Sequence, residues 1–90
     1  MKAYKLTFES VSPLGPGAQF YRGDVPCARP EEVPDEFWHV TEVEHDGSRA
    51  DQYTTLRMWA ESGQQLIRNV RWFEAETTEP EWVERPGPGT

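Results

Sequence analysis

Apolar and polar residues alternate at the start of the chain. Tyr4, Leu6 and Phe8 occupy every second position of residues 3–9, which is the period of a strand with one buried face. The run Ser-Pro-Leu-Gly-Pro-Gly that follows favours turns and cannot continue the strand. A short second strand is expected within residues 20–25, before prolines that keep the next segment extended and irregular.

Residues 37–45 predict a third strand, with apolar side chains on both faces. Trp38 and Val40 share one face with Glu42 and Glu44, and the other face also carries apolar residues. This pattern indicates either a central strand or a strand with a bulge.

Helical spacing of apolar residues predicts one helix over residues 49–62. Tyr53, Leu56 and Trp59 fall on one side of such a helix, and Gly63 is a stop signal at its end. This apolar side is expected to pack on the sheet.

The last predicted strand spans residues 65–76 and again has large apolar groups on both faces. Trp72 and Phe73 are adjacent, so their rings project to opposite faces. Residues 77–90 form an acidic, Pro/Gly-rich tail that is expected to be partly mobile, with Trp82 holding part of it in place.

The order of predicted elements is strand, short strand, strand, helix, strand. Such an order favours an α+β fold, in which an antiparallel sheet of three to four strands has one helix packed on one face. Residues 1–76 are expected to form one compact domain. The hydrophobic fraction is 36% and the net charge is −7, so the core should be thin, with aromatic residues supplying much of its buried surface.

The chain shows no targeting pattern. Met1–Lys5 contains lysines but is not followed by an apolar run, and no segment approaches the roughly 20 apolar residues that cross a bilayer. We therefore expect a cytoplasmic protein without membrane association. Its preference for Arg over Lys is typical of a GC-rich genome, such as that of an actinobacterium or one of its bacteriophages.

Acidic residues gather in two runs. Seven acids and no Lys or Arg lie between Glu31 and Asp46, and five acids lie between Glu74 and Glu84. These runs indicate either a solvated surface or an acidic face that meets a basic partner, including a DNA-mimicking face. Direct nucleic-acid binding is not expected at a net charge of −7.

The basic residues suggest an alternative to an acidic contact surface, namely a local anion-binding site. Arg68 and Arg71 project to opposite faces of a regular strand, so they share one anion only if a bulge intervenes.

Three side chains are candidates for catalysis. His39 and His45 are six positions apart, too far along a strand to cooperate, and we expect a packed His39 and an exposed His45 at a turn. Cys27 has no histidine placed beside it and is expected to be inert. No metal site and no cofactor are predicted, because no set of three or four ligands converges.

The aromatic residues give the main functional indication. One helix covers only one sheet face, whereas large rings are predicted on both, and an apolar patch with a charged rim is typical of a binding surface. The residues predicted to contact a partner are Trp38, Trp72, Phe73 and Trp82, with Glu42 and Glu44 on the rim.

The sequence therefore favours a small, non-enzymatic protein–protein interaction module, phage-encoded or accessory, that binds and modulates a host protein. Its partner would be that protein or a second copy in a homodimer. Substitution of Trp72 by Ala is expected to weaken binding more than folding. Two alternatives stay open: a self-assembling component of a virion or complex, and a small acid–base enzyme that uses His39 and a nearby carboxylate.

Overall fold

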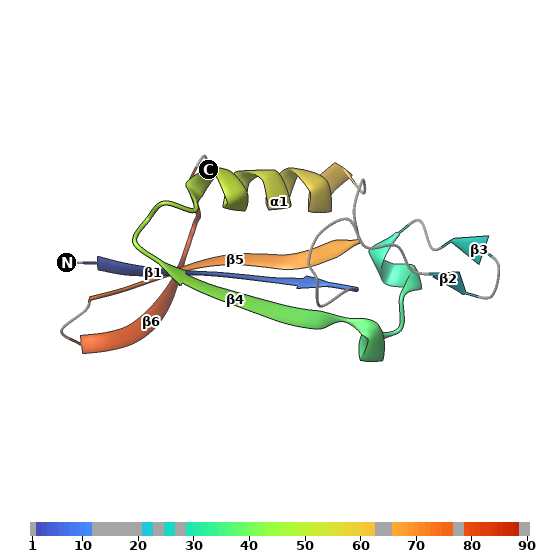
Figure 1. Ribbon diagram of the computed structural model, residues 1–90, viewed down its shortest axis with the longest axis horizontal. Helices are drawn as coiled ribbons and strands as arrows, with labels where there is room; N and C mark the ends of the chain where they lie inside the picture. Colours follow the sequence, from blue (N-terminus) through green and yellow to red (C-terminus); the bar gives the residue numbers. More distant parts are fainter. Residues whose placement is uncertain are drawn as a thin grey trace.

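Figure 1 shows the computed structural model of the chain. The structure describes residues 2–11, 21–22, 25–26, 29–62, 66–76 and 79–88. The strands are β1 (Lys2–Ser10), β2 (Tyr21–Arg22), β3 (Val25–Pro26), β4 (His39–His45), β5 (Ile67–Glu76) and β6 (Glu79–Arg85). The helices are the α-helix α1 (Ala50–Ser62) and the short 3₁₀ turns η1 (Pro30–Glu32) and η2 (Asp35–Phe37).

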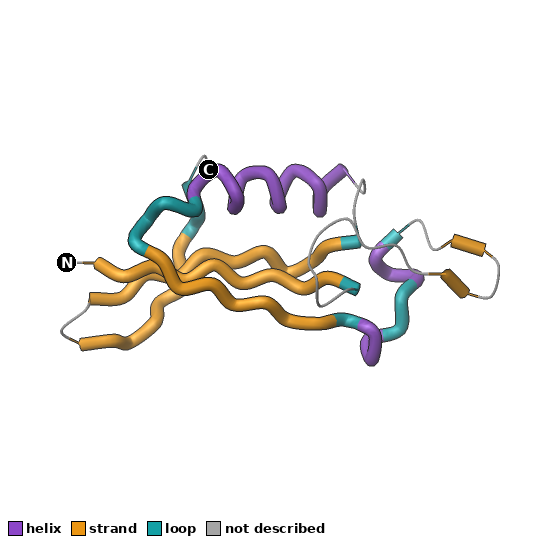
Figure 2. The backbone as a smooth tube through the Cα atoms, viewed as in Figure 1, coloured by secondary structure: helices purple, strands orange, loops and turns teal. Residues whose placement is uncertain are grey.

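The main sheet has four antiparallel strands in the order β4-β1-β5-β6, and α1 lies along one face of it (Figures 1 and 2). This arrangement confirms the predicted α+β class. The first strand is central because β1 pairs with both β4 and β5. The short strand expected within residues 20–25 forms the separate pair β2-β3, so it does not belong to the main sheet.

Two strands differ from the sequence expectations. β4 is an edge strand and pairs with β1 without a bulge, so neither of the two expected alternatives holds. It begins at His39, so Trp38 lies before the strand and does not share its face with Val40. β6 lies within the residues that were assigned to an acidic tail, and it extends the sheet by pairing Glu84 with Phe73 of β5.

The core lies between α1 and the sheet. Its buried residues are Leu6, Phe8, Tyr53, Leu56, Ile67 and Trp72. Burial of a large apolar side chain stabilises a fold by about 1.5–3 kcal/mol, so this cluster accounts for the attachment of the helix. At its centre the ring of Trp72 packs edge-on against Tyr53, with centroids 5.4 Å apart, and lies 5.6 Å from Tyr4.

A second, smaller cluster lies beyond the end of the sheet. Trp38, Val33 and Leu66 are buried together, and Trp38 Nε1 donates a hydrogen bond to the Val33 carbonyl oxygen at 3.4 Å. The guanidinium of Arg68 lies 4.3 Å from the Trp38 ring centroid. Cation–π contact and burial together hold this corner of the fold.

Among the described residues, no helix has the length and the apolar composition needed to cross a membrane.

Candidate functional site

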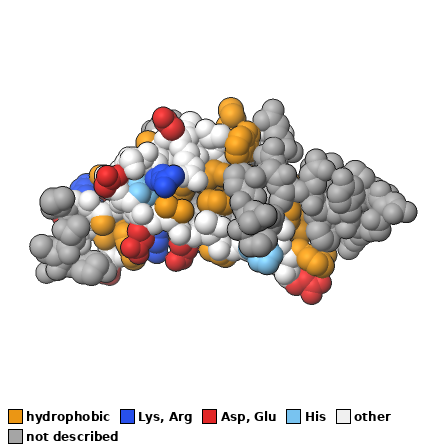
Figure 3. Space-filling model, in the orientation of Figure 1, with side chains coloured by type: hydrophobic (Ala, Val, Ile, Leu, Met, Phe, Trp, Pro, Cys, Tyr) orange, Lys and Arg blue, Asp and Glu red, His pale blue; other side chains and the backbone are white. Residues whose placement is uncertain are grey.

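The sheet has one face that α1 does not cover. The register sets its side chains in rows: Lys5 is opposite Glu44 and Phe73, and Thr7 is opposite Glu42 and Arg71. We call this surface the open face. Its members are Lys5, Thr7, Glu9, Val40, Glu42, Glu44, Arg68, Arg71, Phe73, Trp82 and Glu84. Figure 3 shows charged side chains of both signs interspersed with hydrophobic ones on the side of the molecule in view.

An aromatic pair lies at the centre of the open face. The ammonium of Lys5 is 4.9 Å from the ring centroid of Phe73 and 4.9 Å from that of Trp82. Both rings are half-buried, so each keeps part of its surface exposed to solvent. An ammonium over an exposed ring stabilises by about 0.5–1 kcal/mol, which holds Lys5 and the two rings as one unit.

The β4 side of the open face is acidic and unpaired. Glu42 and Glu44 are exposed, and no basic side chain of the described residues lies within ion-pair distance of either carboxylate. Lys5 is opposite Glu44 in register, but its ammonium lies over the aromatic rings instead. Val40, on the same strand, is 63% exposed. Lys5, Val40 and Glu42 border a depression of about 210 Å³. Thr7 and Arg71 also line it.

The two arginines of β5 face the same side because the strand contains a bulge. The pairing shifts between Thr7 and Glu9, so Thr7 is opposite Arg71 and Glu9 is opposite Arg68. Asn69, inside the bulge, has the left-handed φ of 55° that this kink requires. The two arginines can share a face only if a bulge intervenes, and the structure contains that bulge.

Both arginines already have carboxylate partners. Arg68 forms ion pairs with Glu9 at 3.4 Å and with Asp35 at 3.2 Å, and Arg71 lies 3.5 Å from Glu84. Their positive charge is therefore balanced within the chain, and the geometry does not favour an anion site.

The predicted contact residues divide into two groups. Phe73, Trp82, Glu42 and Glu44 lie together on the open face. Lys5, Val40 and Arg71 lie beside them and are not among the predicted contact residues. The pairing register of β1 with β4 and β5 identifies those additional residues. Alternation within a single strand does not reveal which residues of neighbouring strands lie opposite each other.

The other two predicted contact residues are core residues. Trp72 is 4% exposed beneath α1 and Trp38 is 8% exposed in the second cluster, so neither ring is accessible to a partner. The cause is the register: Trp72 pairs with Leu6 on the helix-facing side, whereas Phe73 faces away from α1.

The two histidines exchange their expected roles. His39 is exposed at the start of β4, whereas His45 stacks on Tyr4 with centroids 5.7 Å apart and packs edge-on against Trp72 at 4.9 Å. Burial lowers the pKa of His45 below its usual 6.5, and the positive charge of Arg49 lowers it further, while Asp46 acts in the opposite direction. Cys27 lies outside the described residues.

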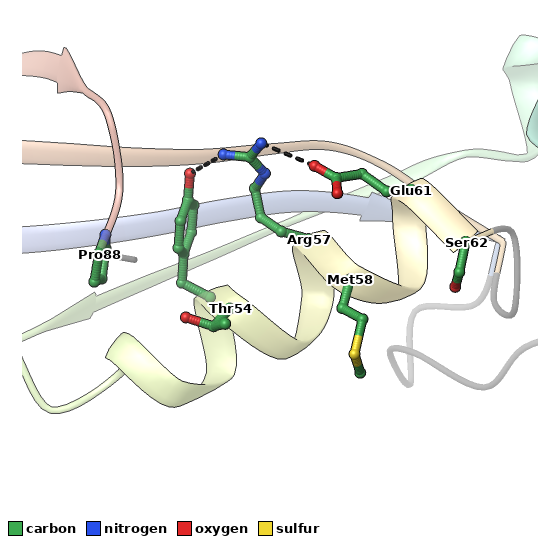
Figure 4. A pocket seen from close by; sticks show the side chains of 7 residues that line it. Thr54, Arg57, Met58, Glu61, Ser62 and Pro88 are labelled. Carbon is green, nitrogen blue, oxygen red and sulfur yellow. Dashed lines mark hydrogen bonds and ion pairs between the residues drawn. The ribbon is translucent and has the colours of Figure 1, made fainter. Parts of the chain in front are cut away.

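A hollow lined by described residues lies beside α1 (Figure 4). It measures about 570 Å³ and runs between the helix and Pro88. Arg57 donates hydrogen bonds to the Tyr53 hydroxyl at 3.0 Å and to Glu61 at 2.9 Å, and both contacts raise its pKa. Its charge is thus already held by side chains of the same helix. No group of three or more metal-ligating side chains occurs in the described part of the chain.

Comparisons of the chain with protein-family models, curated proteins and solved structures found no match.

Proposed function

We propose that the protein is a non-enzymatic protein-binding module whose open face contacts a protein with a basic surface. The observation that carries this proposal is the unpaired acidic pair Glu42 and Glu44 beside the exposed parts of Phe73 and Trp82. Aromatic side chains are typical anchors of protein interfaces, and charges around them set partner choice and register.

Electrostatics favours a basic partner. The net charge of −7 attracts basic proteins over a distance, and this attraction raises association rates at low salt. On close approach, a Lys or Arg of the partner would supply the counter-charge that Glu42 and Glu44 lack within the described residues. The other acids of the open face, Glu9 and Glu84, already have arginine partners.

The test compares retention of a partner by variants of one immobilised protein. Wild type, Trp82→Ala and Met58→Ala are exposed to an actinobacterial lysate, and the retained protein is then purified and titrated with each variant. Met58 is the control because it is 54% exposed on α1, on the other side of the sheet. We expect Trp82→Ala to weaken binding about tenfold or more, with Met58→Ala close to wild type and wild-type binding decreasing with salt.

Equal binding by the two variants, after circular dichroism shows both folded, would exclude the open face as the contact surface. If only the chain itself is recovered, at a fixed oligomeric mass, the proposal of a foreign partner is rejected in favour of self-assembly.

A further inference from the structure

β4 forms a regular sheet edge. It pairs with β1 without a register shift, from Tyr4 opposite His45 to Ser10 opposite His39. In the part of the chain that the structure describes, no strand pairs with its other side. Alternate residues of an edge strand direct their N–H and C=O groups outward, where they can hydrogen-bond with an added strand.

The opposite edge of the sheet is less suited to strand addition. The pairing of β6 with β5 shifts between Glu74 and Glu76, and Pro80 within β6 has no amide hydrogen to donate. Irregular pairing and proline are two devices that protect edge strands, and β4 has neither. The β4 edge is therefore the more accessible one.

The side chains of β4 indicate which strand would fit there. Glu42 and Glu44 project to the open face, while Thr41 and Val43 project to the helix side and are half-buried. Cross-strand neighbours interact most strongly with side chains of opposite charge or with β-branched pairs. A complementary strand therefore alternates basic residues with β-branched ones.

Pairing of two β4 strands from separate copies is disfavoured. In an antiparallel pair centred on Glu42, the two copies of Glu42 face each other, and in one centred on Val43, Glu42 faces Glu44. Like charges directly opposite each other destabilise a sheet pair. These acids therefore act against self-pairing and in favour of a basic strand.

We propose that the outer edge of β4 binds an extended segment of a partner protein as an added strand, with Lys or Arg at alternate positions facing Glu42 and Glu44. This inference rests on the proposed function only for the premise that the partner is a protein. It assigns the contact to the backbone edge of β4, which is distinct from the aromatic pair on the open face. Backbone hydrogen bonds supply the docking geometry, and the two acids select for charge.

The test uses a defined peptide and the purified chain. The probe is the end-blocked peptide Thr-Lys-Val-Lys-Thr-Lys-Thr, which places lysines opposite Glu42 and Glu44 when its seven residues pair with the seven of β4. We expect it to shift the backbone amide resonances of β4 more than those of β6. Glu42→Gln/Glu44→Gln should weaken its binding about tenfold at low salt, while the matched control Glu76→Gln/Glu81→Gln, at two exposed acids outside the open face, should change it less than about twofold.

Two modified peptides separate strand addition from simple charge attraction. One carries N-methyl groups on its lysine amides and the other on its threonine and valine amides, so both retain the full charge. An added strand directs only every second amide toward the edge that it pairs with. We therefore expect one methylated peptide to bind about tenfold more weakly than the probe and the other to bind like the probe.

The inference is overturned if the probe does not bind, if both methylated peptides bind equally well, or if the two double variants weaken binding to the same extent. Failure of the peptide while Trp82→Ala still abolishes partner binding would reject the edge and leave the open face in place. Specific peptide binding at β4 with a partner insensitive to Trp82→Ala would reject the open face and support the edge.

Discussion

Gly87 packs directly against the ring of Tyr53. A Cβ atom built at Gly87 would overlap Cε1 and Cζ of that ring, and Gly87 itself is buried. The chain leaves β6 at Arg85 and returns to α1, where Pro88 lines the hollow beside Tyr53 (Figure 4). The contact fastens the end of the described chain to the helix and explains why a glycine stands at this position.

Substitution of Gly87 by Ala should therefore destabilise the protein. The added methyl group forces Tyr53 or the backbone to move, and overpacking of this kind costs about 1–3 kcal/mol. Urea unfolding followed by tryptophan fluorescence measures the change. The same substitution in a Tyr53→Leu background should cost less, because the ring that it meets is gone. Additive losses in the double variant would show that the segment does not pack on Tyr53.

Neighbouring residues of β5 should respond very differently to truncation. Trp72 is buried beneath α1, so Trp72→Ala is expected to lower the free energy of unfolding by about 3–5 kcal/mol. Phe73 is half-buried on the open face, and Phe73→Ala should lower it by about 1–2 kcal/mol. This order reverses the expectation from sequence that Trp72→Ala would affect binding more than folding. Equal losses measured by urea unfolding would contradict the assigned faces.

The bulge in β5 gives a third prediction. Asn69 has φ of 55°, which glycine adopts freely and β-branched residues adopt only at a cost of about 1–2 kcal/mol. Its side-chain amide also donates a hydrogen bond to Glu9. Asn69→Gly and Asn69→Val both remove this bond, so its loss does not contribute to the stability difference between the two variants. Thermal unfolding should rank the glycine variant above the valine variant, and the opposite ranking would exclude the left-handed bulge.

The sequence predicted most of the fold because the signals it rests on are local. Alternation placed β1, and helical spacing with a following Gly63 placed α1 within one residue of its observed limits. Both patterns depend on side chains a few positions apart, which periodicity captures directly. The fold class follows from the order of these elements.

The features that the sequence did not predict, namely β6 and the burial of Trp72, depend on pairing between strands that are far apart in the chain. β6 contains Pro80 and three glutamates, which disfavour a strand by propensity, and it is held by its pairing with β5. The register of β1 decides that Trp72 faces the helix and Phe73 faces away from it. Adjacent aromatic residues show that both faces receive a ring, but alternation alone cannot say which ring is buried.

His45 is the basis of the last prediction, a loss of stability in mildly acidic solution. Its Nδ1 accepts a hydrogen bond from the Gly47 amide at 3.0 Å, and its Nε2 is buried without a hydrogen-bond partner in the described part of the chain. Protonation would place a second hydrogen against the Gly47 amide, and burial lowers the pKa of His45 below 6.5. The unfolded chain therefore takes up the proton first as the pH falls.

The contribution of His45 to stability is thus fully present above its unfolded pKa of 6.5 and is lost as the pH falls from there through the lower folded pKa. Urea unfolding between about pH 7.5 and 5.5 should show this loss, and His45→Asn, which keeps a hydrogen-bond acceptor, should reduce it.

Variants of the two neighbouring charged residues test what sets the pKa of His45. Arg49→Gln should raise the pKa of His45 and make the loss smaller, whereas Asp46→Asn should lower that pKa and make the loss larger. Ring-proton NMR titration of His45 measures both shifts directly, and a pKa that moves in the same direction in both variants would show that the neighbouring charges do not set it.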